Sequence, residues 1–229
     1  MRCILACDLK GGIVVKGVRG EREKYRPIAE SSRIVHTSSP PEVIGEIKPK
    51  ETYIADLDRI TGVGDHLNII KLLSSMTDTM ADIGVSGVPD FEKALGVSHR
   101  AILGTETAPL KVIEQCQGRR TVVSLDMRHG RTMFSDPALD RAPPEVLKLL
   151  NGLELDAVIL LDVARVGSGE GIDMQLVTSA VSASKHDIIV GGGVRGVPDL
   201  ELLEKCGASG AIIASAVHDC KIPLDLLRF

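Results

Sequence analysis

The second half of the chain repeats the first half in a degraded form. Four short segments of the first half recur in the same order, offset by 106 residues at the least, from Asp56 to Asp162, and by 118 at the most, from Asp8 to Asp126. The matched segments are Asp8–Gly12 with Asp126–Gly130, Asp56–Ile60 with Asp162–Val166, Gly84–Glu92 with Gly193–Glu201, and Ile102–Thr105 with Ile212–Ser215. The repeat predicts two related halves, each beginning with a strand that ends in aspartate.

Short β-rich runs alternate with helical patterns along the chain. The expected strands are continuous apolar runs, typical of parallel strands covered on both faces: Cys3–Asp8, Thr52–Asp56, Thr79–Ile83, Ala101–Gly104, Thr121–Asp126, Ala157–Asp162, Asp187–Gly191 and Gly210–Ala214. The expected helices are Pro41–Ile47, Leu67–Ser74, Asp90–Leu95, Pro109–Gln115, Pro144–Leu150, Asp173–Ala183, Pro198–Glu204 and Leu224–Leu227. Eight such units in 229 residues predict an α/β fold, a (β/α)8 barrel formed by one domain over residues 1–229. An open doubly wound sheet is the alternative, and the two four-unit halves favour the closed barrel.

Composition narrows the range of partners. A net charge of −4 provides no basic surface for nucleic acid or a membrane, and 2% aromatic residues provide no base-stacking platform. Five cysteines without a Cys-x-x-Cys motif argue against a metal site and favour thiols in a reducing cytosol. No apolar run is long enough for a membrane span or a signal peptide. We expect a cytoplasmic protein without metal or cofactor, and the sequence leaves its oligomeric state open.

A glycine-rich turn in the second half is the first candidate for a binding site. Gly191, Gly192 and Gly193 follow an apolar strand and precede an expected helix with an acidic first turn. This layout directs backbone N–H groups and the positive end of a helix at an anion, most often a phosphate. Ala214 and Ser215, after the next strand, provide a second loop of small residues. We expect Gly192, Gly193, Ala214 and Ser215 to bind phosphate; a plain turn without a ligand is the alternative.

Asp8 and Asp126 are the candidate catalytic residues. They end the first and fifth expected strands, which lie opposite each other in an eightfold barrel. Two carboxylates that face each other across the mouth suit proton transfer, one as base and one as acid. The alternative for each is to cap its own loop by accepting backbone hydrogen bonds. The matched pair favours the catalytic interpretation.

Several of these stretches resemble the half-barrel-duplicated enzymes of histidine biosynthesis. The stretches are Ala6–Leu9, Val14–Gly17, Ser124–Arg128, Gly191–Arg195 and Ile212–Ala216. The resemblance is closer to the phosphoribosylformimino-AICAR ribotide isomerase than to the cyclase subunit of imidazole glycerol phosphate synthase. It implies an Amadori rearrangement in which Asp8 moves the proton at C2 and Asp126 helps to open the ribose ring. It also places Ser168 near the second-half phosphate. Lys16 is a further substrate-binding candidate, with a solvated hairpin lysine as the alternative.

The departures from this pattern concern the substrate. The strand-six threonine of the family aligns with Leu161, and the first-half phosphate loop begins with Asp82 where the family has glycine. Glu106 follows the retained Gly104-Thr105 pair. Each of these carboxylates would repel a phosphate by about 1 kcal/mol. We expect a ligand with one phosphate, with Asp82 and Glu106 meeting its amine or hydroxyl groups; solvated loop charges are the alternative.

Three functions fit these observations. The first is a cofactor-free phosphosugar isomerase that converts an aminoaldose to an aminoketose, with a substrate different from that of the family. The second is a cyclase or lyase that uses the same aspartates and receives ammonia from a glutaminase partner. The third is a non-catalytic protein that binds a phosphate ligand. In all three the expected partner is a small sugar phosphate.

Overall fold

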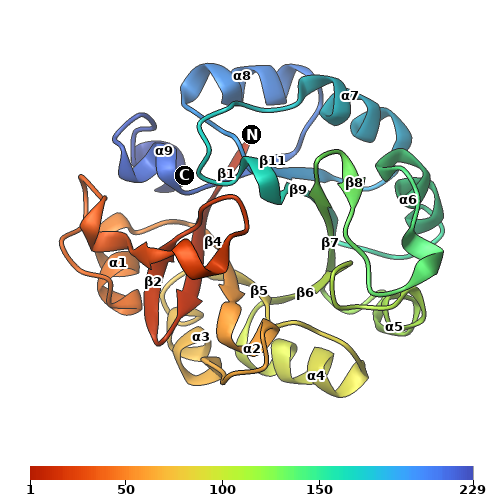
Figure 1. The fold of residues 1–229 in the computed structure, drawn as a ribbon, viewed down its shortest axis with the longest axis horizontal. Helices are drawn as coiled ribbons and strands as arrows, with labels where there is room; N and C mark the ends of the chain where they lie inside the picture. The colour runs from red at the N-terminus through yellow and green to blue at the C-terminus, as the bar shows by residue number, and fades with distance from the viewer. Residues whose placement is uncertain (229) are drawn as a thin grey trace.

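The chain closes into a barrel of eight parallel strands. The computed structural model describes residues 1–228. The barrel strands are β1 (Arg2–Lys10), β4 (Glu51–Asp56), β5 (Asp78–Asp82), β6 (Arg100–Gly104), β7 (Thr121–Arg128), β9 (Ala157–Asp162), β10 (Ile188–Gly191) and β11 (Gly210–Ile213). β1 pairs in parallel with β4 on one side and with β11 on the other, so the sheet has no free edge in the ring (Figure 1). The predicted (β/α)8 barrel is confirmed, and the open sheet is excluded.

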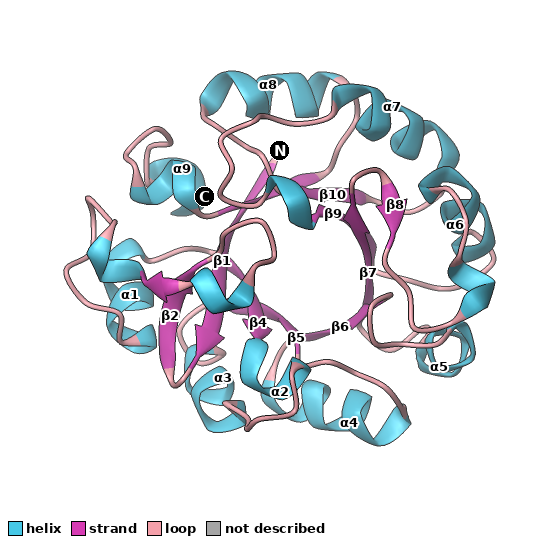
Figure 2. Ribbon diagram, viewed as in Figure 1, coloured by secondary structure: helices cyan, strands magenta, loops and turns pink. Residues whose placement is uncertain are grey.

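Helices surround the strands, as Figure 2 shows. The longer helices are α1 (Pro40–Ile47), α3 (Leu67–Leu73), α4 (Val88–Val97), α5 (Leu110–Cys116), α6 (Pro143–Leu150), α7 (Met174–Ala183) and α8 (Val197–Lys205). Proline occupies the first turn of α1, α4, α6 and α8, where its missing N–H has no helical partner in any case. Short helices α2 (Leu57–Ile60), α9 (Ser215–His218) and α10 (Asp225–Arg228) complete the set. Among residues 1–228, no helix has the length and apolar character needed to span a membrane.

Each half begins with a strand that continues into a hairpin. β1 turns into β2 (Ile13–Lys16), which pairs with β3 (Arg26–Pro27), and β7 turns into β8 (Arg131–Thr132). Single-turn 3-10 helices lie at Arg22–Lys24, Ile28–Glu30, Pro137–Leu139 and Val163–Arg165. The sequence indicated a hairpin at Lys16 but not the bounds of these short strands, since two to four residues carry too short an alternation to delimit them. β2 and β8 pair with the parts of β1 and β7 that continue beyond the strand-end aspartates, Asp8 and Asp126.

The alternation of side chains along the strands produces two apolar layers. Residues such as Ile4, Tyr53 and Ile159 fill the barrel interior. Their neighbours along the strands, Leu5 and Ile54 among them, pack in the larger cluster between the strands and the helices. The same alternation directs the last inward residue of each strand to the barrel mouth, which places the functional side chains described below.

The buried Phe91 of α4 tests how strongly the helix layer supports the barrel. Its side chain is fully buried, with the Arg119 guanidinium 5.3 Å from the ring centre. Phe91→Ala should lower the free energy of unfolding in urea by about 3–5 kcal/mol, because it leaves a cavity. Leu202→Ala on the exposed face of α8 is the matched control and should change it by less than about 0.5 kcal/mol. A small effect at Phe91 would show that α4 does not pack as described.

Candidate functional site

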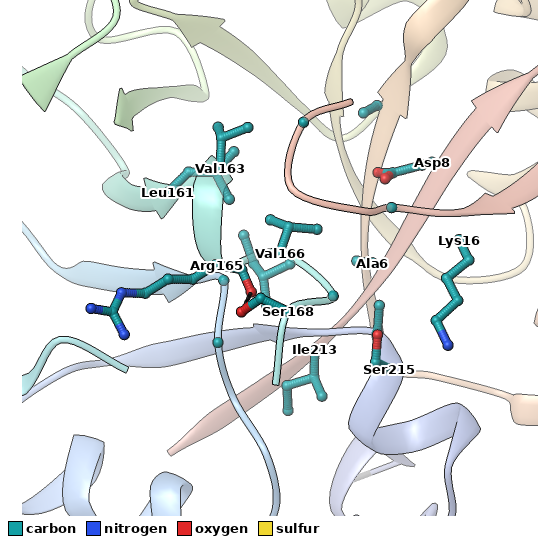
Figure 3. Close-up of a pocket in the computed structure, with 18 of the residues that line it drawn as sticks. Ala6, Asp8, Lys16, Leu161, Val163, Arg165, Val166, Ser168, Ile213 and Ser215 are labelled. Carbon is teal, nitrogen blue, oxygen red and sulfur yellow. Dashed lines mark hydrogen bonds between the residues drawn. The ribbon is translucent and has the colours of Figure 1, made fainter. Parts of the chain in front are cut away.

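A cavity of about 420 Å³ lies at the carboxyl ends of the barrel strands. All ten residues that the sequence analysis selected line it: Asp8, Lys16, Asp82, Glu106, Asp126, Ser168, Gly192, Gly193, Ala214 and Ser215. Figure 3 shows Asp8, Ser168 and Ser215 around one space although they follow three different strands. Barrel enzymes carry their active sites at this end. The roles of the ten residues stay predictions.

Two matching rows of inward residues form the floor of the cavity. In the first half Asp8, Ala55 and Asp82 lie side by side in register. In the second half the corresponding row is Asp126, Leu161 and Gly191. Both rows begin with aspartate, and β1 and β7 lie on opposite sides of the ring. The rows differ at their third position, where the first half carries a carboxylate and the second half carries glycine.

Burial raises the pKa of both opposing aspartates. The pKa of Asp8 is raised to about 6 by burial, against the nearby Arg22 guanidinium, which lowers it. The pKa of Asp126 is raised to about 7 by burial and then by the charge of Asp82, although Ser124 Oγ donates to its Oδ1 at 2.6 Å. Carboxyl groups with pKa values near neutrality can both accept and donate a proton at physiological pH. The two aspartates can therefore hold different protonation states in the same cavity.

Asp82 is a third buried carboxyl at the mouth. Burial raises its pKa to about 6. Its Oδ1 accepts a hydrogen bond from Gly84 N at 2.9 Å. Gly84 corresponds to Gly193 in the repeat, so the first-half loop uses its own carboxylate to occupy the N–H that an anion would need. In the structure the Gly84 N–H is therefore not free to bind an anion.

The second-half loops, unlike the first-half loop, leave backbone N–H groups free at the cavity. Gly192 and Gly193 have φ values of +92° and +90°, and a Cβ atom on either would lie 2.3 Å from a backbone oxygen, Asp162 O or Gly171 O. Only glycine fits at these two positions. Within residues 1–228, the backbone N–H groups of Gly193, Ser215 and Ala216 have no hydrogen-bond acceptor. These free donors lie at the cavity wall, where they can bind an anion.

Basic and polar side chains lie near these loops. Lys16, Arg195 and Lys221 line the same cavity, although Arg195 also donates to Asp199 and Lys221 pairs with Asp219. His218 is also there, and burial lowers its pKa to about 4, so its ring is neutral. Ser32 Oγ accepts from two backbone N–H groups and lies 2.9 Å from His218 Nδ1, so its hydroxyl proton points to that nitrogen. His218 therefore carries its proton on Nε2.

A segment of the first hairpin connection, residues 17–25, covers part of the mouth. Gly17 passes so close to Asp8 that a Cβ atom would lie 2.9 Å from Asp8 Oδ2. Arg19 N donates to Val166 O at 2.8 Å, which joins the segment to the opposite half. Arg22 forms an ion pair with Glu106 at 2.9 Å. Sequence reasoning missed Arg22 and His218, because neither lies in a motif and their partners are distant in sequence.

Leu161 replaces the threonine that the resemblance led us to look for. Its side chain lies in the cavity wall and packs over Gly191, where a Cβ atom would lie 2.7 Å from Leu161 Cδ1. Arg165 also lines the cavity but its guanidinium is bound to Asp162 and to Gly171 O. The cavity wall in the second half is therefore apolar at this point. No group of His, Cys, Asp and Glu side chains in residues 1–228 is arranged to hold a metal ion.

The raised pKa of Asp126 gives a testable effect of pH on stability. Because the folded protein holds this proton more tightly than the unfolded chain, the stability contribution falls as pH rises from about 4 to about 7. The free energy of unfolding of Asp126→Asn, relative to that of the unchanged protein, should therefore increase with pH across this range and stay constant above it. We expect the gain in urea unfolding to be about 1–3 kcal/mol larger at pH 8 than at pH 5.

Asp199→Asn is the opposite control. The hydrogen bond from Arg195 lowers the pKa of Asp199 in the folded protein. The Asp199→Asn variant should therefore lose most stability at neutral pH, where this carboxylate is ionised in both the folded and the unfolded chain, and less as the pH falls below about 4. A pH-independent difference for Asp126→Asn would contradict the raised pKa.

Comparison with known proteins places the chain in a family. Residues 2–223 match the family described as histidine biosynthesis protein. An uncharacterized protein of Methanocaldococcus jannaschii is 36% identical over 98% of this chain and 96% of its own length. Phosphoribosyl imidazole-4-carboxamide isomerases of Thermus thermophilus and Methanosphaera stadtmanae are 25% and 27% identical, over 98% and 100% of this chain and 97% and 99% of their own. The closed duplicated barrel and these matches agree, and the chain belongs to the histidine biosynthesis protein family.

Proposed function

We propose that this protein is an Amadori-type isomerase that converts an aminoaldose phosphate carrying one phosphate group to the corresponding aminoketose. The observation that carries the proposal is the pair of aspartates, Asp8 and Asp126, which face each other across one cavity from equivalent strands. The isomerase names of the Thermus and Methanosphaera relatives support the reaction class. The free backbone N–H groups of the second-half loops can donate hydrogen bonds to the phosphate of the substrate.

We assign the two aspartates to different steps, following the resemblance, and their raised pKa values support proton transfer by both. Asp126, with a pKa raised to about 7 chiefly by burial, remains partly protonated near neutrality and can donate a proton to the ring oxygen as the C1–O bond breaks. Asp8, with a pKa of about 6, is mostly ionised there and can remove the proton at C2. Removal of that proton converts the open-chain iminium to an enolamine. A proton returned to C1, with loss of the hydroxyl proton on O2, then gives the aminoketose.

The single phosphate follows from the difference between the two halves. The names of the isomerase relatives contain two phosphoribosyl groups. In this chain the Gly84 N–H is already bound to Asp82, whereas the matching Gly193 N–H is free. A dianion at the first-half loop would have to displace a buried carboxylate. We infer that the substrate places its phosphate at Gly192, Gly193, Ala214 and Ser215, with Ser168 and Lys16 beside it.

The two other functions fit less well. A cyclase needs ammonia from a partner, and the named relatives above are isomerases. A protein that only binds phosphate has no need for two opposing carboxyl groups with raised pKa values, which are unfavourable to bury. The isomerase uses both features of the cavity.

Loss of either aspartate tests the chemistry. With an N-aryl ribosylamine 5-phosphate in D₂O, the unchanged protein should form ketose that has lost the C2 hydrogen and gained deuterium at C1, followed by NMR. Asp8→Asn and Asp126→Asn should each lower the rate by about 10²–10⁴-fold. The rate of the unchanged protein should rise with pH near 6 and fall above about 7, since the base must be ionised and the acid protonated.

Glu201→Gln, an exposed carboxylate on α8 outside the cavity, is the matched control and should retain full activity. Equal turnover by the Asp8 variant and the unchanged protein would refute the assignment of the base. Absence of turnover in the unchanged protein, with tight binding of the compound, would favour the non-catalytic function.

The number of anion sites tests the single-phosphate part. Calorimetric titration with inorganic phosphate should give one site in the unchanged protein. Asp82→Gly combined with Glu106→Ala frees the Gly84 N–H and removes two negative charges, so it should add a second site and leave the first unchanged. Two equivalent sites before mutation would contradict the proposal.

A further inference from the structure

At and just beyond the carboxyl ends of β5, β6 and β7 the cavity holds three acidic side chains, of which Asp82 and Glu106 have no part in the proposed phosphate site or proton transfer. Asp82, Glu106 and Asp126 form this acidic end, and all three line the cavity. We propose that the acidic end is a binding subsite for a cationic group of the substrate, an ammonium or amidinium, and that Arg22 occupies it when substrate is absent. The inference rests on the proposed function, which places the phosphate at the opposite end.

Asp82 provides an acceptor oxygen that faces the cavity. The residue is only 8% exposed, and its Oδ1 accepts from Gly84 N, while within residues 1–228 its Oδ2 has no hydrogen-bond partner. A carboxylate oxygen that is accessible only through the cavity and lacks a protein donor can accept a hydrogen bond from a bound molecule. The free oxygen lies in the cavity wall, so a donor from a bound molecule can reach it.

Gly104 keeps the space between two carboxylates open. A Cβ atom at this position would lie 2.8 Å from Asp126 Oδ2 and 3.3 Å from Asp82 Oδ2. Both oxygens therefore border the same small gap, and any larger residue would fill it. Two acceptor oxygens that lie this close together suit a protonated nitrogen that donates to both.

Arg22 shows that a cation is accommodated at this end. Its guanidinium contacts Glu106 Oε2 at 2.9 Å. Both side chains are about one-third exposed, so the pair is accessible to solvent and exchangeable. The charge of Arg22 lowers the pKa of both Asp8 and Asp82, which places it above the cavity floor. A substrate cation would replace this internal counter-ion, and Arg22 would move with its segment, residues 17–25.

Charge favours a cation over a hydroxyl group at this end. The negative charges at this end repel one another. In addition to burial, the charge of Glu106 raises the pKa of Asp82, and the charge of Asp82 raises the pKa of Asp126. A hydroxyl can donate one hydrogen bond but leaves this repulsion in place. An ammonium or amidinium provides several donors and offsets the negative charge.

Pairs of alkyl phosphates test the subsite. The probes are ω-aminoalkyl phosphates of three to seven carbons, each compared by calorimetry with the alkyl phosphate of equal length and with the ω-hydroxyalkyl phosphate. The length series finds the span from phosphate site to acidic end. At the best length, the amine should bind about ten-fold more tightly than either partner, as expected for one charge-assisted contact in a partly buried site.

Variants locate the effect. Asp82→Asn with Glu106→Gln should abolish the advantage of the amine without weakening the alkyl phosphate, and Glu106→Gln alone, at a partly exposed position, should reduce it. Arg22→Ala removes the competing cation and should strengthen binding of the amine only. Glu201→Gln, an exposed charge-matched change on α8, should leave the advantage intact.

The outcomes separate the subsite from the proposed function. Equal binding of amine, hydroxyl and alkyl probes overturns the cation subsite and leaves the phosphate site standing. An advantage that persists in the Asp82 and Glu106 double variant also overturns it, because the amine then binds elsewhere. Failure of every probe to bind overturns the phosphate site, and with it the orientation on which the inference depends.

Discussion

Closure of the ring by β1 is the constraint on which the site depends. Because β1 pairs with both β4 and β11, the last inward residue of every strand must face the same mouth. An open sheet would separate Asp8 from Asp126 along its width. In the closed barrel these two residues, 118 positions apart in sequence, share one cavity. Duplication of a four-strand unit thus yields two equivalent carboxyl groups that face each other.

Divergence of the two halves then gives the cavity two different ends. Both rows of inward residues begin with aspartate, but the third position is Asp82 in one row and Gly191 in the other. A single carboxylate at that position occupies the Gly84 N–H and makes its end acidic. The other end retains free N–H groups with Lys16 beside them. One molecule with a negative and a positive end would match this polarity, with its reacting carbons between the two aspartates.

The sequence predicts the fold well because its two signals reinforce each other. The internal repeat and the eight apolar runs both favour a closed parallel barrel, and the predicted strand ends fall within two residues of those observed. The residues at the strand ends could also be predicted from the sequence, since the positions of Asp8, Asp126 and Asp82 follow directly from alternation along a strand. Contacts between distant loops could not be predicted in this way. The Arg22–Glu106 pair and the proton position on His218 depend on how segments 84 or more residues apart pack together, and no local pattern encodes that.

The most direct test of this account is a crystal of the unchanged protein soaked in inorganic sulfate at moderate concentration. The account predicts one sulfate in the cavity, bound by the N–H groups of Gly193, Ser215 and Ala216, with the Gly84 N–H still donating to Asp82. A sulfate at the Gly84 loop, with the Asp82 side chain displaced, would contradict the account. So would an empty second-half site beside an occupied first-half site.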